Sequence, residues 1–225
     1  MQLKKPTHKL VLGIICVTFL FLYATCGQKE PTKSNTQPSF KKAYQQIAAS
    51  QKYIRSGDLI TRRGNDITSY SLKQFSQQNN TYSHCGIASI ENDTVFVYHA
   101  IGGECNPDQK LKRETFAQFC NPAENEAFGI FRLPINNTIW TRLHNTILTY
   151  YKAEIKFDMK FDLSTDDRMY CAEFVSKAYS KAFQQSHMFS TYHIKNWEYI
   201  AVDNIFLYKK CTPIANAFFN ACDSI

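Results

Sequence analysis

The chain has 225 residues and a formal net charge of +7, and 44% of its residues are hydrophobic and 14% aromatic. This composition excludes an extensively disordered chain and is sufficient for one domain with a full core. Lys4, Lys5 and Lys9 account for part of the charge; the chain after residue 25 has 23 basic against 19 acidic residues, a net of +4. That excess is too small to indicate a nucleic-acid-binding protein, so no nucleic-acid partner is expected.

Residues 1–25 have the layout of an export leader. A basic start precedes the apolar run 10–24, whose 15 residues fall short of the roughly 20 needed to span a bilayer. Cys26 follows directly, which resembles a bacterial lipoprotein leader. We therefore expect a signal peptide over 1–25, lipidation of Cys26, a flexible tether over 26–38 and a domain over 39–225, anchored to a membrane of the cell envelope on the periplasmic or outer-membrane side. Secretion without a lipid, or an uncleaved anchor, are the alternatives.

Six cysteines follow the leader region: Cys85, Cys105, Cys120, Cys171, Cys211 and Cys222. None forms a CxxC pair, so neither a zinc site nor any other metal is expected. Proximity in sequence makes Cys105 with Cys120, and Cys211 with Cys222, candidate disulfides. Cys85 and Cys171 would then remain thiols.

Residues 39–100 are predicted to form a helix, a short strand, a second helix or irregular crossing, and then a β-hairpin. Residues 39–54 have the apolar spacing of an amphipathic helix, 58–61 read as a short strand after the turn at Gly57 and Asp58, and 66–78 as a helix or an irregular crossing. The segments 83–90 and 94–100 are strand-like and flank turn-forming residues, which predicts a β-hairpin.

The register of this hairpin decides whether its two histidines can interact. A loop of two residues (Glu91, Asn92) or of four (90–93) places His84 opposite His99 on one face, whereas a three-residue loop places them on opposite faces. Cys85 points away from His84 in either case, which predicts a core position. A single histidine in a strand is more often a packed or exposed residue, but two on one face indicate a site.

The rest of the chain shows shorter patterns of helix and strand. We expect a short helix at 114–119, a strand at 127–133, a helix capped near Asn136, extended segments at 155–163 and 199–208, and a short helix at 213–222. The apolar positions of the helix after Asn136 are Ile139, Leu143, Ile147 and Tyr151.

Residues 164–183, STDDRMYCAEFVSKAYSKAF, predict a helix that carries Cys171 near its start. Apolar residues recur at helical spacing, and the polar residues at 164–167 include good N-caps. The apolar stripe consists of Cys171, Phe174, Val175, Ala178, Tyr179 and Ala182. When a thiol lies close both to a helix N-terminus and to a histidine, its pKa can fall well below 8.5. Cys171 is therefore a candidate nucleophile, although free cysteines are also common as buried packing residues.

Five segments in this order resemble one family: GDLITRRGND, YSHCGIA, VFVYHA, FDMKFDL and MYCAEFV. They look like the circularly permuted papain-like amidases of the NlpC superfamily, in the YaeF/YiiX branch, in which the histidine strands precede the cysteine helix. The resemblance covers roughly residues 40–210. It implies an α+β fold in which an antiparallel sheet or small barrel packs against helices, with the nucleophile at a helix N-terminus.

By position, the resemblance implies that Cys171 is the nucleophile, His84 the general base and His99 the residue that orients His84. A glutamate looks usual at the third position in this branch, so His99 is a departure. The backbone N–H of Cys171 would supply part of an oxyanion hole, with Tyr170 as a weaker candidate. Asp58 is expected to fix a turn rather than to act in chemistry.

The resemblance implies a cell-envelope cysteine amidase or peptidase that hydrolyses an amide, in peptidoglycan or a related peptide, without a cofactor. The same thiol could instead hydrolyse or transfer a lipid acyl chain, as in lecithin retinol acyltransferase-like enzymes, or the domain could be a non-catalytic binding module. An apolar pocket would favour a lipid, whereas a polar pocket with a carboxylate-binding cation would favour a peptide. The candidate cations are Arg62, Arg63 and Arg168.

Overall fold

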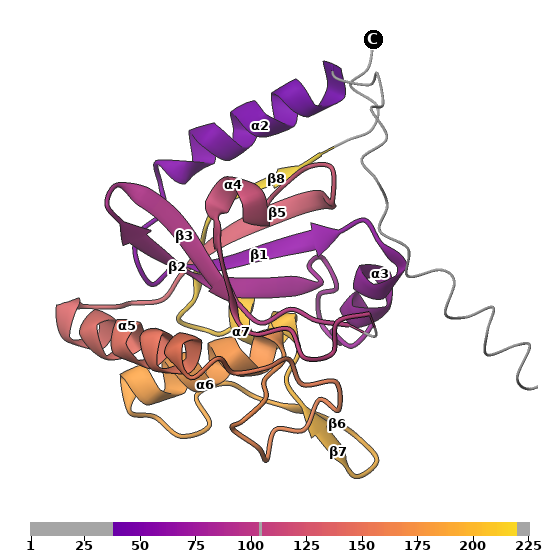
Figure 1. Cartoon of the computed structure of the whole chain (residues 1–225), viewed down its shortest axis with the longest axis vertical. Helices are drawn as coiled ribbons and strands as arrows, with labels where there is room; N and C mark the ends of the chain where they lie inside the picture. Colours follow the sequence, from indigo (N-terminus) through magenta and orange to yellow (C-terminus); the bar gives the residue numbers. More distant parts are fainter. Residues whose placement is uncertain (1–37, 104, 220–225) are drawn as a thin grey trace, which may run out of the picture. The chain divides into compact units, whose positions relative to one another are not determined.

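The computed structural model describes residues 38–103 and 105–219, which form a mixed α+β domain. The expected leader, most of the tether, Cys26 and Cys222 lie outside the described residues. A six-stranded antiparallel sheet has the order β4-β3-β2-β1-β5-β8, and a separate two-stranded hairpin pairs β6 with β7. Helices lie on both faces of the large sheet (Figure 1).

The described helices are α2 (Pro38–Gln51), α3 (Ile67–Lys73), α4 (Phe116–Phe119), α5 (Asn137–Lys152), α6 (Cys171–Phe183) and α7 (Val202–Phe206). The strands of the large sheet are β1 (Leu59–Gly64), β2 (His84–Glu91), β3 (Thr94–His99), β4 (Lys112–Thr115), β5 (Asn125–Arg132) and β8 (Thr212–Phe218). The hairpin consists of β6 (Tyr192–Ile194) and β7 (Trp197–Tyr199). Within the described ranges, no helix combines the length and apolar character that a membrane span requires.

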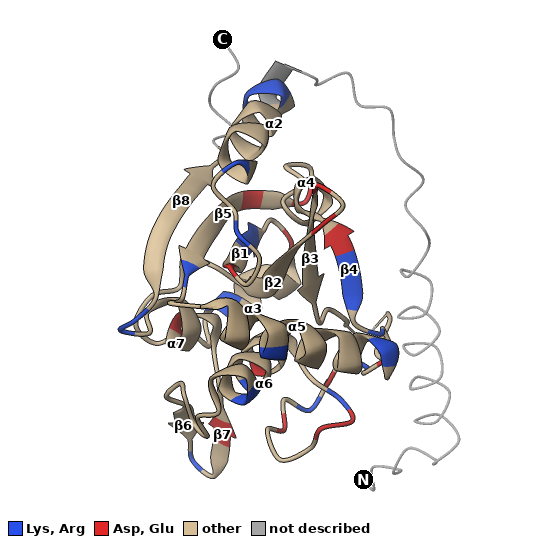
Figure 2. Ribbon diagram, turned by 90° about the vertical axis from the view of Figure 1, so that its left-hand side faces the viewer, with Lys and Arg blue, Asp and Glu red and all other residues tan. Residues whose placement is uncertain are grey.

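Alternation along the strands divides the core into two clusters. Leu59, Cys85 and Ile87 face the helices α5 and α6, whereas Ile60 and Ala88 face the side that α2 and α4 cover. Figure 1 shows α5 and α6 together on one side of the sheet and α2 on the other. Charged residues lie mainly on helix surfaces and loops, while most strands carry few of them (Figure 2).

The central hairpin turns at Asn92 and Asp93, which both have positive φ (47° and 62°), as a two-residue type I′ turn requires. Glu91 pairs with Thr94 and Ile87 with Tyr98, so the loop is one residue later than either arrangement considered above. His84 and His99 still share a face, because the register continues with His99 beside Gly86, two residues from His84. They are diagonal neighbours rather than a directly opposed pair.

Helix α6 begins later than the sequence pattern predicts. Its first residue is Cys171, and the residue at the N-cap position is Tyr170. The expected caps are used elsewhere, since the Thr165 carbonyl and the Asp166 carboxylate contact Lys177. All six residues of the predicted apolar stripe are buried, so the face of the helix is as expected while its start is not.

Several of the other expectations were wrong. The segment 199–208 contains the helix α7, capped by the Asn204 side chain on the Ala201 N–H (2.8 Å), and 213–222 contains β8 rather than a helix, since it pairs with β5. The strand β4 was not anticipated. On α5, Tyr150 is the buried aromatic residue and Tyr151 is 38% exposed.

The cysteines do not follow the pairing expected from sequence proximity. Cys120 and Cys211 are free, and Cys120 is fully buried. Cys105 is disulfide-bonded, but Cys120 is not its partner. Cys85 and Cys171 are free thiols, as expected.

Gly86 is required by the close approach of β2 and β3. A Cβ atom at Gly86 would lie 2.7 Å from the Tyr98 carbonyl oxygen and 2.9 Å from the His99 Cβ. Gly86→Ala should therefore lower the free energy of unfolding by about 1–3 kcal/mol, the usual cost of overpacking a core. Urea denaturation measures this, with Gly103→Ala as the matched control, because its Cβ meets nothing within 4 Å. Equal effects of the two substitutions would contradict the packing described.

Candidate active site

Three adjacent strands bring together a row of polar side chains on the α2–α4 face of the sheet. Nε2 of His84 on β2 lies 2.8 Å from Nδ1 of His99 on β3. Nε2 of His99 lies 3.0 Å from a carboxylate oxygen of Glu114 on β4. Glu114 pairs with Val97 in the strand register, which puts it diagonally next to His99 on the same face.

The chain of hydrogen bonds has a defined direction. An ionised carboxylate only accepts hydrogen bonds, so Nε2 of His99 carries the proton that it donates to Glu114. In a neutral ring Nδ1 of His99 is then an acceptor, and Nε2 of His84 must be the donor. Nδ1 of His84 is left with a free lone pair. Glu114 thus fixes both tautomers and prepares Nδ1 of His84 to accept a proton.

Both imidazoles are held neutral by their surroundings. Burial, followed by the nearby charges of Arg62, His99 and Lys112, lowers the pKa of His84 well below its ordinary value. Burial also lowers the pKa of His99, to about 4, even though Glu114 acts in the opposite direction. The hydrogen bond to His99 lowers the pKa of Glu114 to about 2. At neutral pH the row therefore consists of a carboxylate and two neutral rings.

Phe119 is the apolar support of this row. Its ring lies 5.6 Å from His84 and 5.0 Å from His99 between centroids, and the Arg62 guanidinium lies 4.8 Å from its centroid. The backbone carbonyl of Phe119 also accepts a hydrogen bond from Arg62 Nη1 at 2.9 Å. One aromatic side chain of α4 thus packs against three polar groups and excludes water from them.

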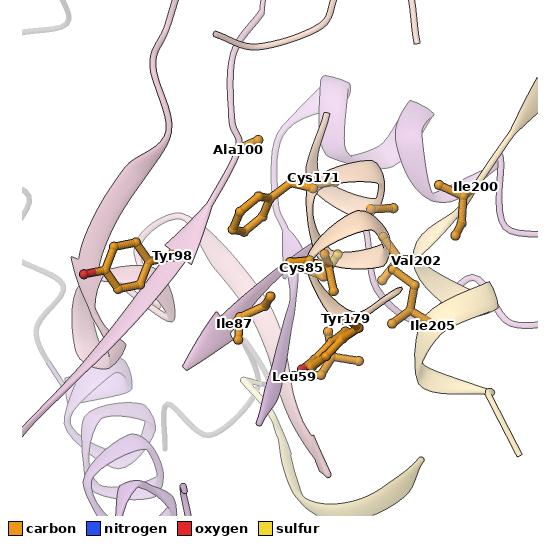
Figure 3. Packing of buried hydrophobic residues seen from close by; sticks show 14 of the residues in the cluster. Leu59, Cys85, Ile87, Tyr98, Ala100, Cys171, Tyr179, Ile200, Val202 and Ile205 are labelled. Carbon is orange, nitrogen blue, oxygen red and sulfur yellow. The ribbon is translucent and has the colours of Figure 1, made fainter. Parts of the chain in front are cut away.

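Cys171 approaches from the opposite face of the sheet. It is buried in the cluster beneath α6 together with Cys85, and Figure 3 shows Cys171 at the start of α6 close to Cys85 on its strand. A hydrogen bond from the Cys85 thiol lowers the pKa of Cys171, aided by backbone N–H groups of Cys85 and Ala172 and opposed by burial. Burial and this contact raise the pKa of Cys85. The thiol of Cys171 therefore contacts Cys85 in this structure, and not the imidazole of the neighbouring His84.

The two groups nevertheless border the same cavity. This cavity, of about 400 Å³, opens where β2 begins, and both His84 and Cys171 line it. Its walls are mainly apolar and aromatic, with Leu72, Phe75, Ile101, Phe157, Phe161, Tyr170, Trp197, Tyr199 and Ile200 among its lining residues. Trp197 and Tyr199 stack on each other at 4.5 Å, and Phe75 meets both edge-on. A cavity with such walls is suited to bind an apolar ligand.

The other residues singled out from the sequence have different positions. Tyr170 lines the cavity, and its hydroxyl accepts a hydrogen bond from the Ile200 N–H at 2.9 Å; burial raises its pKa. Asp58 is buried and binds Arg132 and the Arg55 N–H, which is a turn-fixing arrangement. Arg168 pairs with Asp108 at 2.7 Å and is not among the residues that line the cavity.

The start of α6 is fixed by a buried glutamate. Glu173 accepts a hydrogen bond from the Tyr170 N–H at 3.2 Å and pairs with Lys177 at 2.8 Å. Burial raises the pKa of Glu173 to about 7. Glu173 thus caps the helix from inside, directly behind the residue that carries the candidate nucleophile.

Sequence reasoning missed three residues of this site. Glu114 was assigned only to a short helix, Phe119 had no role, and Cys85 was assigned to packing alone. Cys85 is fully buried, as expected, but it also contacts the Cys171 thiol. The sequence contains no usable signal for Glu114, because segment 112–115 is short, charged and without apolar alternation, and its carboxylate is located only by the strand register.

Comparisons with known proteins give a structural relationship only. No family model matches the chain, and no curated protein matches it. A crystal structure described as the metalloprotein yiiX from Escherichia coli O157:H7 aligns with a TM-score of 0.60 and 20% identity, covering 73% of this chain and 98% of that one. The chain shares the fold of yiiX. At this identity the likeness shows the fold alone.

The word metalloprotein in the description of yiiX raises the question of a metal here. Among residues 38–103 and 105–219, no group of three or more His, Cys, Asp or Glu side chains is placed to hold an ion. The facing nitrogens of His84 and His99 are hydrogen-bonded to each other, and the charges of Arg62 and Lys112 act on both rings. These residues do not fit a cation site.

The tautomers and pKa values of the two histidines can be measured by ¹⁵N NMR of the imidazoles. We expect both rings to be neutral with the proton on Nε2 at pH 7. On acidification, His99 should protonate with a midpoint near pH 4, and His84 with a midpoint well below that of free histidine, because burial disfavours the charged ring. Glu114→Gln should disturb the tautomer of His99. A proton on Nδ1 of His84 at neutral pH would contradict the hydrogen-bond direction.

The role of Cys85 can be tested through the reactivity of Cys171. Cys85→Ala removes a hydrogen bond to the thiolate, so the pKa of Cys171 should rise and its alkylation by iodoacetamide at pH 7 should slow several-fold. Mass spectrometry of the Cys171 peptide across a pH series measures this. Cys85→Ser keeps a donor and should be closer to the wild type, and Cys120→Ala is the matched control for loss of a buried thiol. A pH profile unchanged by Cys85→Ala would contradict the assignment.

Proposed function

We propose that the chain is a thiol hydrolase with a permuted papain-like fold, in which Cys171 forms an acyl intermediate. The observation that supports it best is the hydrogen-bond chain from Glu114 through His99 to His84, which leaves a basic nitrogen at a cavity that Cys171 also lines. Nucleophile, base and orienting groups are the components that such chemistry needs. The fold shared with yiiX is compatible with this proposal.

In the proposed reaction the Cys171 side chain rotates from Cys85 toward His84. Nδ1 of His84 takes the thiol proton, and the thiolate attacks the carbonyl carbon of the substrate. The imidazolium then gives this proton to the leaving group as the bond to it breaks. Water, deprotonated by His84, hydrolyses the thioester and restores the thiol. The N–H of Cys171, at the start of α6, stabilises the oxyanion; such a donor typically contributes about 3 kcal/mol.

The cavity favours the lipid-acyl alternative over a peptidoglycan peptide. Apolar surface predominates in its lining around Cys171, and it favours an apolar acyl group by removing that group from water. We therefore propose an apolar acyl group as the part transferred to Cys171. The proposed place of action is a membrane surface of the cell envelope, with the lipid on Cys26 as the anchor.

The nucleophile is tested first. Cys171 should react with iodoacetamide at pH 7 faster than free cysteine, and His84→Ala should slow this reaction, since general-base assistance typically contributes about 10²- to 10⁴-fold. His144→Ala, on α5 away from the cavity, is the matched control. Labelling no faster than free cysteine, and unaffected by His84→Ala, would support a binding module instead.

The acyl group is identified by trapping it. The full chain is incubated with an envelope extract, quenched in acid and digested, and the Cys171 peptide is weighed. We expect the mass of a fatty acyl adduct that Cys171→Ala lacks and that hydroxylamine removes. A peptide adduct would overturn the preference for an apolar acyl group but keep the thiol hydrolase.

A further inference from the structure

Arg62 is a buried cation without a carboxylate partner. It is only 9% exposed, and its hydrogen bond goes to a neutral group, the Phe119 carbonyl. Among the described residues no carboxylate lies within ion-pair distance of it, whereas Arg63, Arg113, Arg132 and Arg168 each pair with an acid. Buried charges are normally paired, because their desolvation is costly. The positive charge of Arg62 is therefore not neutralised by a paired carboxylate among the described residues.

The strand register places this charge next to the base. Arg62 on β1 pairs with His84 on β2, so both side chains lie on the same face. Figure 2 shows the basic segment of β1 within the sheet. Arg62 lines the cavity that contains Cys171 and also the neighbouring cavity of about 430 Å³, and the two share Ile101 and Glu124. Its guanidinium can thus be reached by a molecule bound at Cys171.

The nearby acids do not neutralise Arg62. Glu114 already binds His99 and Lys112. Glu124 is exposed, so water screens its charge. Both act on Arg62 only at a distance. A planar guanidinium with free N–H groups is suited to bind a carboxylate or phosphate through two hydrogen bonds.

We propose that Arg62 is the anion-binding residue of the substrate site, and that the acyl substrate of Cys171 carries a carboxylate or phosphate group near the bond that is cleaved. This inference rests on the proposed function. It combines the two pocket features that sequence reasoning treated as alternatives, an apolar wall and a cation. An anion on Arg62 would also offset the charge that disfavours protonation of His84, and so make this base stronger when substrate is bound.

Two alkylating agents of similar size test the proposal. Iodoacetate is an anion and iodoacetamide is neutral, so the ratio of their rates at Cys171 reports an anion-binding charge and cancels the reactivity of the thiol itself. We expect the wild-type ratio to exceed that of free cysteine by about tenfold, equivalent to roughly 1.4 kcal/mol. Arg62→Gln should bring the ratio down to that of free cysteine. Arg63→Gln, which removes a cation paired with Glu126, should leave it unchanged.

Arg62→Lys is the second variant, since it keeps the charge if Arg62→Gln does not fold, and it should retain an intermediate ratio. A wild-type ratio equal to that of free cysteine, or an equal ratio in Arg62→Gln and the wild type, overturns the proposal. Slow labelling by both reagents would instead contradict the proposed function, because the absolute rates report the reactivity of the Cys171 thiol. The ratio of the two rates does not depend on that reactivity, so the two failures can be told apart.

Ligand protection identifies the anion. Octanoate, octyl phosphate and octanol have the same apolar tail, and each is tested for protection of Cys171 from iodoacetamide. We expect one of the two anions to protect at concentrations at least tenfold below octanol, and to lose this advantage in Arg62→Gln. The better anion shows whether a carboxylate or a phosphate is recognised. Equal protection by all three compounds overturns the proposal.

Discussion

The hydrogen bond between Nε2 of His84 and Nδ1 of His99 is the interaction on which the site depends. It exists because a type I′ turn at Asn92 and Asp93 sets the register and because Gly86 lets the strands approach closely. Its direction is imposed from β4, where the Glu114 carboxylate can only accept. Burial keeps both rings neutral. The strand register therefore determines which side chains form this row, and the row in turn determines that Nδ1 of His84 carries no proton.

Cys171, the proposed nucleophile, is positioned independently of this row. Glu173 holds the first turn of α6 from behind, and Cys85 holds the thiol from the sheet. Because Cys85 and His84 are consecutive on β2, they point to opposite faces, and the Cys171 sulfur and the His84 imidazole approach the cavity from different sides of the sheet. The site is therefore built around the first two residues of one strand, and its geometry follows from where that strand begins.

The sequence predicted the features that depend on local patterns. The helical stripe through Cys171 and Tyr179 and the strands that carry His84 and His99 were correctly assigned, since their periodicity is strong. The start of α6 was not predictable, because its cap is supplied by Glu173 and the candidate caps bind Lys177. Glu114 was missed because β4 is a short charged segment without apolar alternation, and only the register shows where its carboxylate lies. The pairing of β8 with β5 is likewise a long-range contact.

The position of β8 affects the folding of this chain during its synthesis. It forms one edge of the large sheet and pairs with β5 through nearly its whole length, although the chain between them holds α5, α6 and α7. Until residues 212–218 have left the ribosome, β5 presents an unpaired backbone edge, and such edges readily add strands from other chains. Contacts of this separation also slow folding. β8 thus covers a backbone edge of β5 that would otherwise be open to strands of other copies.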